Sequence, residues 1–162
     1  MITVKLISNA APAGEWLRYF PKSEPVWGNC RFTFDRAARK YDWLVVYEDV
    51  PPEGGGDKYQ AFEQLACPQE QTLLVTTEPS SIKCYGKAYT SQFGHVLTSQ
   101  EAWALPHPRR IYSQPALRWF YGVGKHHVRT LDDMIAHPPA DKTRLISAAS
   151  SSKRQRPVWK AG

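Results

Sequence analysis

Acidic residues stand directly after the two most apolar stretches of the sequence. Glu48 and Asp49 follow the run WLVVY at residues 43–47, and Glu78 follows TLLVTT at residues 72–77. Continuous apolar runs of this kind are typical of strands that are covered on both faces, as in a parallel sheet. Ligands of such sheets bind outside the carboxyl ends of the strands, so these carboxylates are predicted to lie where a ligand binds.

Glu78 has two interpretations from its residue type and position. If Pro79 is a first helical residue, the Glu78 carboxylate favours the positive end of a short helix and has no chemical role. As a general base, Glu78 would take the proton of a hydroxyl group that attacks an activated centre. That role needs one carboxylate within hydrogen-bond reach of the hydroxyl, in a cleft that raises the carboxyl pKa towards neutrality.

Three polar residues after the Glu-Pro pair are candidates for substrate binding: Ser81, Lys83 and Tyr85. At this spacing, however, residues such as Lys83 and Tyr85 are more often solvated or packing residues than ligand-binding ones. Trp103 and the run WFY at residues 119–121 could stack on a sugar ring, but packing in a core or an interface explains them as well.

No metal site and no disulfide is predicted. The adjacent His126 and His127 would point apart on a strand and have no third partner at a useful spacing. Cys30, Cys67 and Cys84 are widely spaced and form no CxxC pair, so we expect small buried hydrophobic residues in a reducing cytoplasm.

The composition predicts a single domain with an anionic partner. The chain has 162 residues, 42% of them apolar, with no signal-peptide pattern and no run of eighteen apolar residues. Its net charge of +6 favours nucleic acid, a phosphorylated ligand or an anionic membrane face. The basic residues form short patches at 107–110, 124–129 and 153–156 and no long nucleic-acid-binding arm. We therefore expect a cytoplasmic protein without a nucleic-acid partner, with peripheral association to the inner face of the membrane through these patches.

Strands and helical segments alternate along the chain. This order predicts an α/β layered domain with a largely parallel, Rossmann-like sheet. Strands are predicted at residues 2–8, 30–35, 72–77, 95–99 and 144–150, and within 41–52 around the apolar run at 43–47. Helical segments are predicted at 14–20, at 59–66, and at 130–137 with Thr130 as N-cap, while residues 80–93 fit a short helix or an irregular turn broken near Gly86. Residues 51–59 are predicted to form a glycine-rich loop and residues 100–122 an ordered surface segment without regular structure.

The string TTEPSSIKCYGKAYTSQFGHVLTS, at residues 76–99, resembles a segment of glycosyltransferase family 10, the α-1,3/1,4-fucosyltransferases. In that family a strand leads into a Glu, a Pro and one or two Ser, then through a polar stretch to a strand with a Leu-Thr/Ser ending. YDWLVVYEDVP at 41–51 resembles the family's earlier strand and loop, and LRWFYG at 117–122 its aromatic, glycine-containing stretch. DKTRLISAASSSK at 141–153 is similar to the start of its donor-binding domain. The resemblance spans residues 42–153 and rests on the order and spacing of these motifs.

The resemblance implies the N-terminal half of a GT-B glycosyltransferase, in which two Rossmann-like domains face each other across a cleft. It also implies inverting transfer of fucose from the donor substrate GDP-fucose to a hydroxyl of a glycan acceptor, without an essential metal or another cofactor. Glu78 matches the family's general base, which lies in the acceptor-side half.

The resemblance divides the chain into an acceptor-side domain at residues 1–140, the start of a donor-binding domain at 141–152, and a disordered tail at 153–162. A tail that is a frameshifted remnant of the donor domain is an alternative. The residues that would bind the diphosphate are absent, so we expect a truncated enzyme with little or no activity alone. A non-catalytic domain that binds a glycan or a nucleotide sugar is the second interpretation. A nucleic-acid-binding module is disfavoured, because it would need aromatic and basic residues interleaved on an exposed sheet face.

Overall fold

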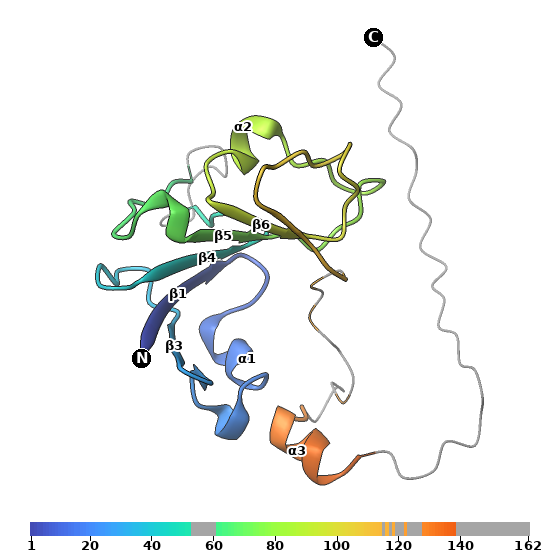
Figure 1. Ribbon diagram of the computed structural model, residues 1–162. Coiled ribbons are helices and arrows are strands. Elements are labelled where there is room, and N and C mark those ends of the chain that lie inside the picture. Colours follow the sequence, from blue (N-terminus) through green and yellow to red (C-terminus); the bar gives the residue numbers. More distant parts are fainter. Residues whose placement is uncertain (53–60, 115, 117, 119–121, 123–127, 139–162) are drawn as a thin grey trace, which may run out of the picture.

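The computed structural model describes residues 1–52, 61–114, 116, 118, 122 and 128–138. Their centre is a seven-stranded sheet in the order β2-β3-β1-β4-β5-β6-β7 (Figure 1). Only the pairing of β2 with β3 is antiparallel, so the predicted α/β fold with a largely parallel sheet is confirmed. The strands are β1 (Ile2–Ser8), β2 (Val26–Trp27), β3 (Cys30–Thr33), β4 (Trp43–Tyr47), β5 (Thr72–Val75), β6 (His95–Thr98) and β7 (Arg110–Tyr112).

The helices of the described residues are short. They are α1 (Ala13–Leu17), α2 (Lys87–Thr90) and α3 (Leu131–Ala136), with single 3-10 turns η1 (Pro21–Ser23) and η4 (Gln69–Gln71). Figure 1 shows α1 and α2 on opposite faces of the sheet. In this part of the chain, no helix is long and apolar enough to cross a membrane.

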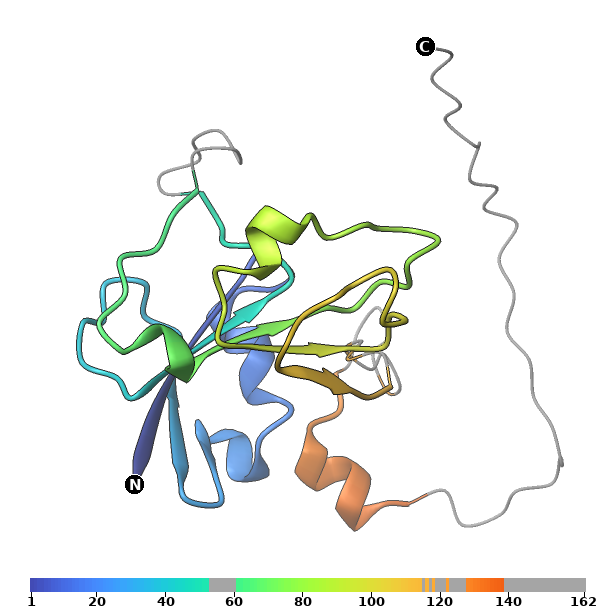
Figure 2. The same cartoon turned by 45° about the horizontal axis from the view of Figure 1, so that its top comes forward.

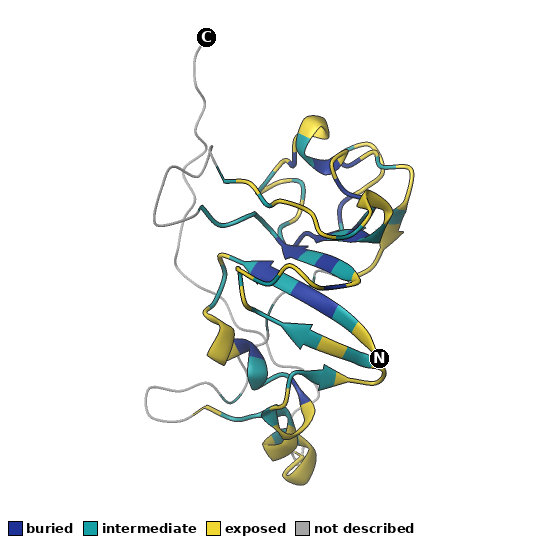
Figure 3. Cartoon of the chain, turned by 90° about the vertical axis from the view of Figure 1, so that its left-hand side faces the viewer, coloured by how far each residue is buried: buried dark blue, intermediate teal, exposed yellow. Residues whose placement is uncertain are grey.

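Each face of the sheet has its own core, because successive residues of a strand point to opposite faces. On the α2 side, Leu44 and Val46 of β4 pack with Leu74 of β5. On the α1 side, Tyr47 packs on Trp16, with ring centroids 5.0 Å apart and the rings nearly perpendicular. The run WLVVY is therefore covered on both faces, as predicted, and buried positions recur along the central strands (Figure 3).

The direction in which the sheet grows reverses between β1 and β4. From β1 the chain adds β3 on one side, and then β4, β5, β6 and β7 on the other. Since these six strands are parallel, their carboxyl ends meet at one edge of the sheet. At such a reversal, the loops that follow the two neighbouring strands run in opposite directions and leave a crevice outside the strand ends.

A buried charge network lies beneath the α2-side core. The Lys5 side chain on β1 is 0% exposed, and its Nζ lies 2.8 Å from Glu63 Oε1. The same nitrogen donates to the carbonyl oxygens of Arg36 at 2.6 Å and Ala38 at 3.0 Å. Arg36 Nε lies 2.8 Å from the second Glu63 oxygen. This network holds residues 61–66 against the loop that follows β3.

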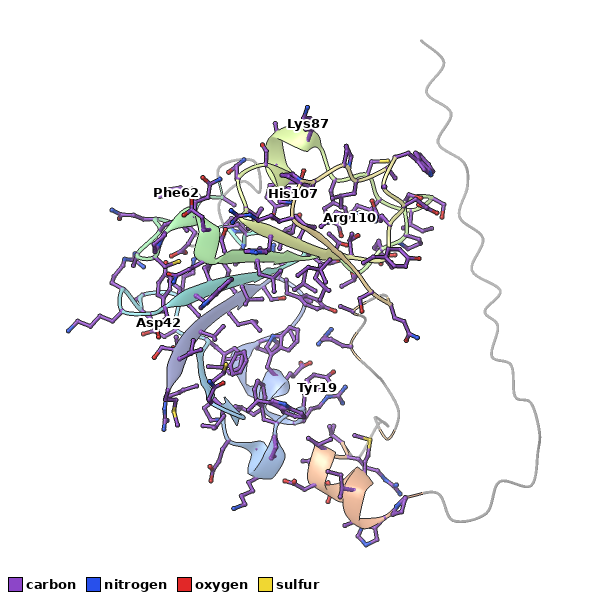
Figure 4. The ribbon with its side chains drawn as sticks, viewed as in Figure 1. Tyr19, Asp42, Phe62, Lys87, His107 and Arg110 are labelled. Carbon is purple, nitrogen blue, oxygen red and sulfur yellow. The ribbon has the colours of Figure 1, made fainter. Side chains whose placement is uncertain are left out.

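The prediction of a helix at residues 59–66 is wrong for residues 61–66, which form no helix. Residues 59 and 60 lie outside the described residues. The Phe62 carbonyl oxygen accepts a hydrogen bond from Arg36, and the Ala66 amide donates to the Tyr41 hydroxyl. These tertiary bonds replace helical ones. The Phe62 side chain is 66% exposed and so contributes little to a buried helix face (Figure 4).

Pairing at the sheet edges also differs from the predictions. Residues 110–112 form β7 inside the segment predicted to lack regular structure, and β2 was not predicted at all. Both strands are too short to show a period of two, and they become strands by pairing with β6 and β3.

The helix predicted at 14–20 ends at Leu17. The strand predicted at 144–150, the segment 141–152 and the tail 153–162 lie outside the described residues.

Of residues 80–93, predicted as a short helix or an irregular turn broken near Gly86, only Lys87–Thr90 are helical and form α2, and the helix predicted after Thr130 is confirmed as α3. Thr130 caps α3: its hydroxyl accepts from the Asp133 amide, while the Asp133 carboxylate accepts from the Thr130 amide. The Lys22 amide in η1 donates to Asp132 Oδ2 at 2.5 Å. This bond places α3 beside the α1 end of the molecule, as Figure 2 also shows.

Replacing Gly94 with alanine should destabilise the fold by about 1–3 kcal/mol. A Cβ atom there would lie 2.5 Å from the Gln69 carbonyl oxygen and 2.7 Å from the Glu70 Cα, and neither backbone atom can rotate away. Urea unfolding measures the loss. Gly14→Ala is the control, since its Cβ meets nothing within 4 Å, and an equal loss in both variants would contradict the steric explanation.

Candidate active site

Polar side chains gather where β4, β5 and β6 end. Glu48 and Asp49 follow β4, Thr77 and Glu78 lie just beyond β5, and Gln100 lies just beyond β6. The parallel register brings these three chain segments side by side, as the carboxyl-end rule predicts.

Glu48 ties the loop after β4 to the loop after β5. Its carboxylate Oε1 accepts a hydrogen bond from the Thr77 hydroxyl, and its amide donates to the Val75 carbonyl oxygen at 2.9 Å. The Tyr89 hydroxyl donates to the Glu48 carbonyl oxygen at 3.1 Å. Glu48 has a φ of 69°, a left-handed conformation that non-glycine residues adopt rarely and that is often found at functional sites. The hydrogen bonds of the Glu48 carboxylate, amide and carbonyl oxygen together hold the backbone in this conformation.

Gln100 holds the loop that carries Glu78. Its side chain is buried, and Nε2 donates to the carbonyl oxygens of Glu78 and Lys83, both at 2.8 Å. Its own amide donates to Thr98 Oγ1, and its carbonyl oxygen accepts from Arg110 at 2.6 Å. The backbone at Glu78 is thus fixed by a side chain that is anchored on β6 and β7.

The Glu78 side chain is half-buried and has no hydrogen-bond or ion-pair partner among the described residues. No regular helix begins at Pro79, so the interpretation of Glu78 as a helix-entry residue applies to one turn at most. In that turn the Ile82 and Lys83 amides donate to the Pro79 carbonyl oxygen at 2.9 and 3.1 Å, and the next helix begins only at Lys87. The role of Glu78 as a general base stays a prediction.

The three predicted substrate-binding residues differ in their surroundings. Ser81 is exposed. Lys83 Nζ lies 2.7 Å from Asp49 Oδ2 and 4.7 Å from the centroid of the Tyr85 ring. Tyr85 is 6% exposed and packs in the α2-side core, but its hydroxyl has no hydrogen-bond partner among the described residues. Lys83 and Tyr85 therefore come together beside Asp49.

A cavity of about 1050 Å³ opens next to this group on the α2 side of the sheet. Asp49 and Lys83 stand at its rim, and Leu44 and Val46 contribute to its apolar floor. Glu78 does not line it. The cavity extends along the α2 face of the sheet from Asp49 to Thr72 and Phe93, near the amino ends of β5 and β6, so the cavity and the Glu78 carboxylate do not form one pocket.

Sequence reasoning placed Glu48 and Asp49 at this edge but missed the roles of Thr77 and Gln100. Gln100 directly follows the run HVLTS, so the rule that selected the other residues, polar side chains at strand ends, would have found it. The bond between Thr77 and Glu48 has no such signal, since it depends on the β4–β5 register.

Other predicted candidates contribute little within the described residues. Trp103 is exposed and stands in a turn, and residues 119–121, 126 and 127 lie outside the described part. Cys84 is exposed, so its prediction as a buried residue is wrong, while Cys30 and Cys67 are partly buried. No cluster of three or more His, Cys, Asp or Glu suited to a metal occurs among the described residues.

Replacing Tyr85 with phenylalanine should leave stability at neutral pH unchanged or raised, because it removes a buried hydroxyl without a hydrogen-bond partner in the described part of the chain. Burial raises the pKa of Tyr85 above its ordinary value of 10.0, with the nearby Glu48 carboxylate as the second cause. The folded chain therefore keeps a proton that the unfolded chain loses, and stability should fall as the pH rises above about 10.

The unfolding midpoint between about pH 9 and 11 should accordingly fall less in Tyr85→Phe than in the wild type. Tyr112→Phe, at an exposed position, serves as the control. Parallel alkaline curves for the wild type and Tyr85→Phe would rule out this contribution of Tyr85.

Among models of protein families, curated proteins and solved structures, none matches this chain.

Proposed function

We propose that this chain is the acceptor-side domain of an inverting glycosyltransferase of the fucosyltransferase kind, equivalent to the N-terminal half of a GT-B enzyme. Glu78 takes the proton of an acceptor hydroxyl as that oxygen attacks the anomeric carbon of fucose in GDP-fucose, while the bond between this carbon and the diphosphate oxygen breaks and GDP leaves. The proposal joins the motif resemblance around Glu78 to one structural observation, the half-buried Glu78 carboxylate without a partner among the described residues.

The surroundings of Glu78 support this role. A general base must keep a lone pair free and must be held where the acceptor hydroxyl arrives. The bonds of Gln100 to the carbonyl oxygens of Glu78 and Lys83 hold the loop, while the side chain of Glu78 remains available. An inverting displacement needs one base on the attacking face, and one free carboxylate at a strand end meets that need.

The cavity beside Asp49 and Lys83 supports a second candidate, a non-catalytic domain that binds a glycan or a nucleotide sugar. Its apolar floor and charged rim are typical of small-molecule sites. In this case sugar hydroxyls would contact the Asp49–Lys83 pair, and no proton transfer by Glu78 would occur.

Saturation-transfer NMR of the full chain with a panel of neutral disaccharides tests both candidates. Binding is expected for either one. A transfer assay with GDP-fucose then separates them, run with the chain alone and with a fucosyltransferase donor-binding domain supplied in trans. Transfer only when both domains are present supports the enzyme proposal, and glycan binding without transfer in any combination supports the binding domain. A chain that neither binds a glycan nor supports transfer would exclude both.

A further inference from the structure

A second cavity, of about 480 Å³, lies at the carboxyl edge where the strand order reverses. Its walls come from the loops that follow β1, β3 and β4: Ser8 and residues 11–13, residues 34–39 in part, and residues 51–52. We call it the reversal crevice. In parallel sheets this position is the usual place for a ligand, and the volume is in the range of small-molecule sites.

Most of the reversal crevice is apolar, with Trp16 as its largest side chain. The lining residues with polar side chains are Ser8, Arg36 and Arg39, and no acidic residue is among the described lining residues. The crevice therefore combines an apolar wall with a cationic one.

The Arg36 guanidinium is held in one orientation. Its NH1 donates to the Pro51 carbonyl oxygen and its NH2 to the Phe62 carbonyl oxygen, both at 2.8 Å. Its Nε lies 2.8 Å from Glu63 Oε2. With five N–H groups in total, Arg36 keeps donors that these bonds do not use.

Of the two arginines, Arg39 has more N–H groups without a partner among the described residues. Its NH1 donates to the Arg36 carbonyl oxygen at 3.1 Å and lies 3.6 Å from Glu63 Oε1. No described residue bonds to its Nε or NH2, and its side chain is about half exposed. Lys5, Arg36 and Arg39 share the single carboxylate of Glu63, so two positive charges are uncompensated within this cluster.

We propose that the reversal crevice binds a phosphate or carboxylate group carried by a small apolar molecule. The Arg39 fork takes the oxyanion, since guanidinium donors match the oxygen spacing of both groups, and the apolar body lies against Trp16. This site is separate from Glu78 and does not depend on the proposed transferase activity.

NMR titration of the full chain tests the proposal, with the Trp16 indole N–H as the reporter. Three probes of similar shape are used: phenyl phosphate, benzoate and the uncharged benzyl alcohol. Saturable binding of at least one anion, with benzyl alcohol weaker, is expected. Tighter phenyl phosphate would assign the site to phosphate esters, and tighter benzoate to carboxylic acids.

Arg39→Gln should weaken anion binding by about tenfold or more, because one charged hydrogen-bonding group is lost, and Arg39→Lys should weaken it less, because it keeps the charge. Arg31→Gln, which removes an exposed arginine on β3, is the matched control for net charge and should have little effect. The proposal is overturned if neither anion saturates, if benzyl alcohol binds as tightly as the anions, or if Arg39→Gln and Arg31→Gln weaken binding equally.

Discussion

Replacing Glu78 with glutamine should lower fucosyl transfer by about 10²–10⁴-fold, the usual contribution of a general base. Glutamine keeps the size and polarity of the side chain but cannot accept a proton at neutral pH. The Gln100 bonds go to backbone atoms of residues 78 and 83, so the loop should keep its conformation. Acceptor affinity should therefore change by no more than about threefold, because binding and proton removal depend on different properties of the side chain.

The transfer assay with a donor-binding domain in trans measures this effect, and NMR with the same acceptor measures affinity. Glu70→Gln is the matched control, an exposed glutamate in η4 near the start of β5 and so at the opposite end of that strand. Near-normal turnover of Glu78→Gln would falsify the assignment. A loss of acceptor binding equal to the loss of turnover would instead make Glu78 a binding residue.

Replacing Glu63 with alanine should destabilise the fold by about 3–5 kcal/mol, because it leaves the buried Lys5 ammonium without its carboxylate. The carbonyl oxygens of Arg36 and Ala38 still accept from Lys5, but they do not neutralise its charge. Arg36 loses its partner as well. Residues 61–66, which these bonds fix, should open first.

Urea unfolding of Glu63→Ala and of the exposed control Glu24→Ala measures the loss. The double variant Lys5→Met/Glu63→Ala should recover part of the stability, since it removes the unpaired charge and fills the site with an unbranched apolar side chain. A loss below about 1 kcal/mol in Glu63→Ala, or no recovery in the double variant, would show that this network contributes little.

Elements whose signals are local could be predicted from the sequence. The strands at 2–8, 43–47 and 95–98 follow from runs of apolar and β-branched residues that need only a sheet to be buried. α3 follows from the Thr130 cap and the acidic first turn. The same local reasoning also placed Glu48, Asp49 and Glu78 at strand ends, where the structure has them.

Elements that depend on distant partners could not be predicted. Residues 61–66 have the apolar spacing of a helix, yet the pairing of Glu63 with Lys5, 58 residues away, holds them in an irregular conformation. β2 and β7 become strands only because β3 and β6 offer free edges. In each case an ion pair or backbone pairing with a distant residue competes with a weak local preference of the chain for another conformation. The distant interaction is the stronger of the two.

The fold class, the largely parallel sheet and the acidic residues after β4 and β5 follow from the sequence alone. These features depend on the order and apolar content of short segments, which the chain carries without reference to tertiary contacts. Tertiary contacts determine that Glu78 has no partner among the described residues while Glu48 bonds to Thr77, that Tyr85 is buried, and that Arg36 and Arg39 line a crevice. The physical reason is that a charged side chain has several partners within reach, and the register of the strands selects which one it meets.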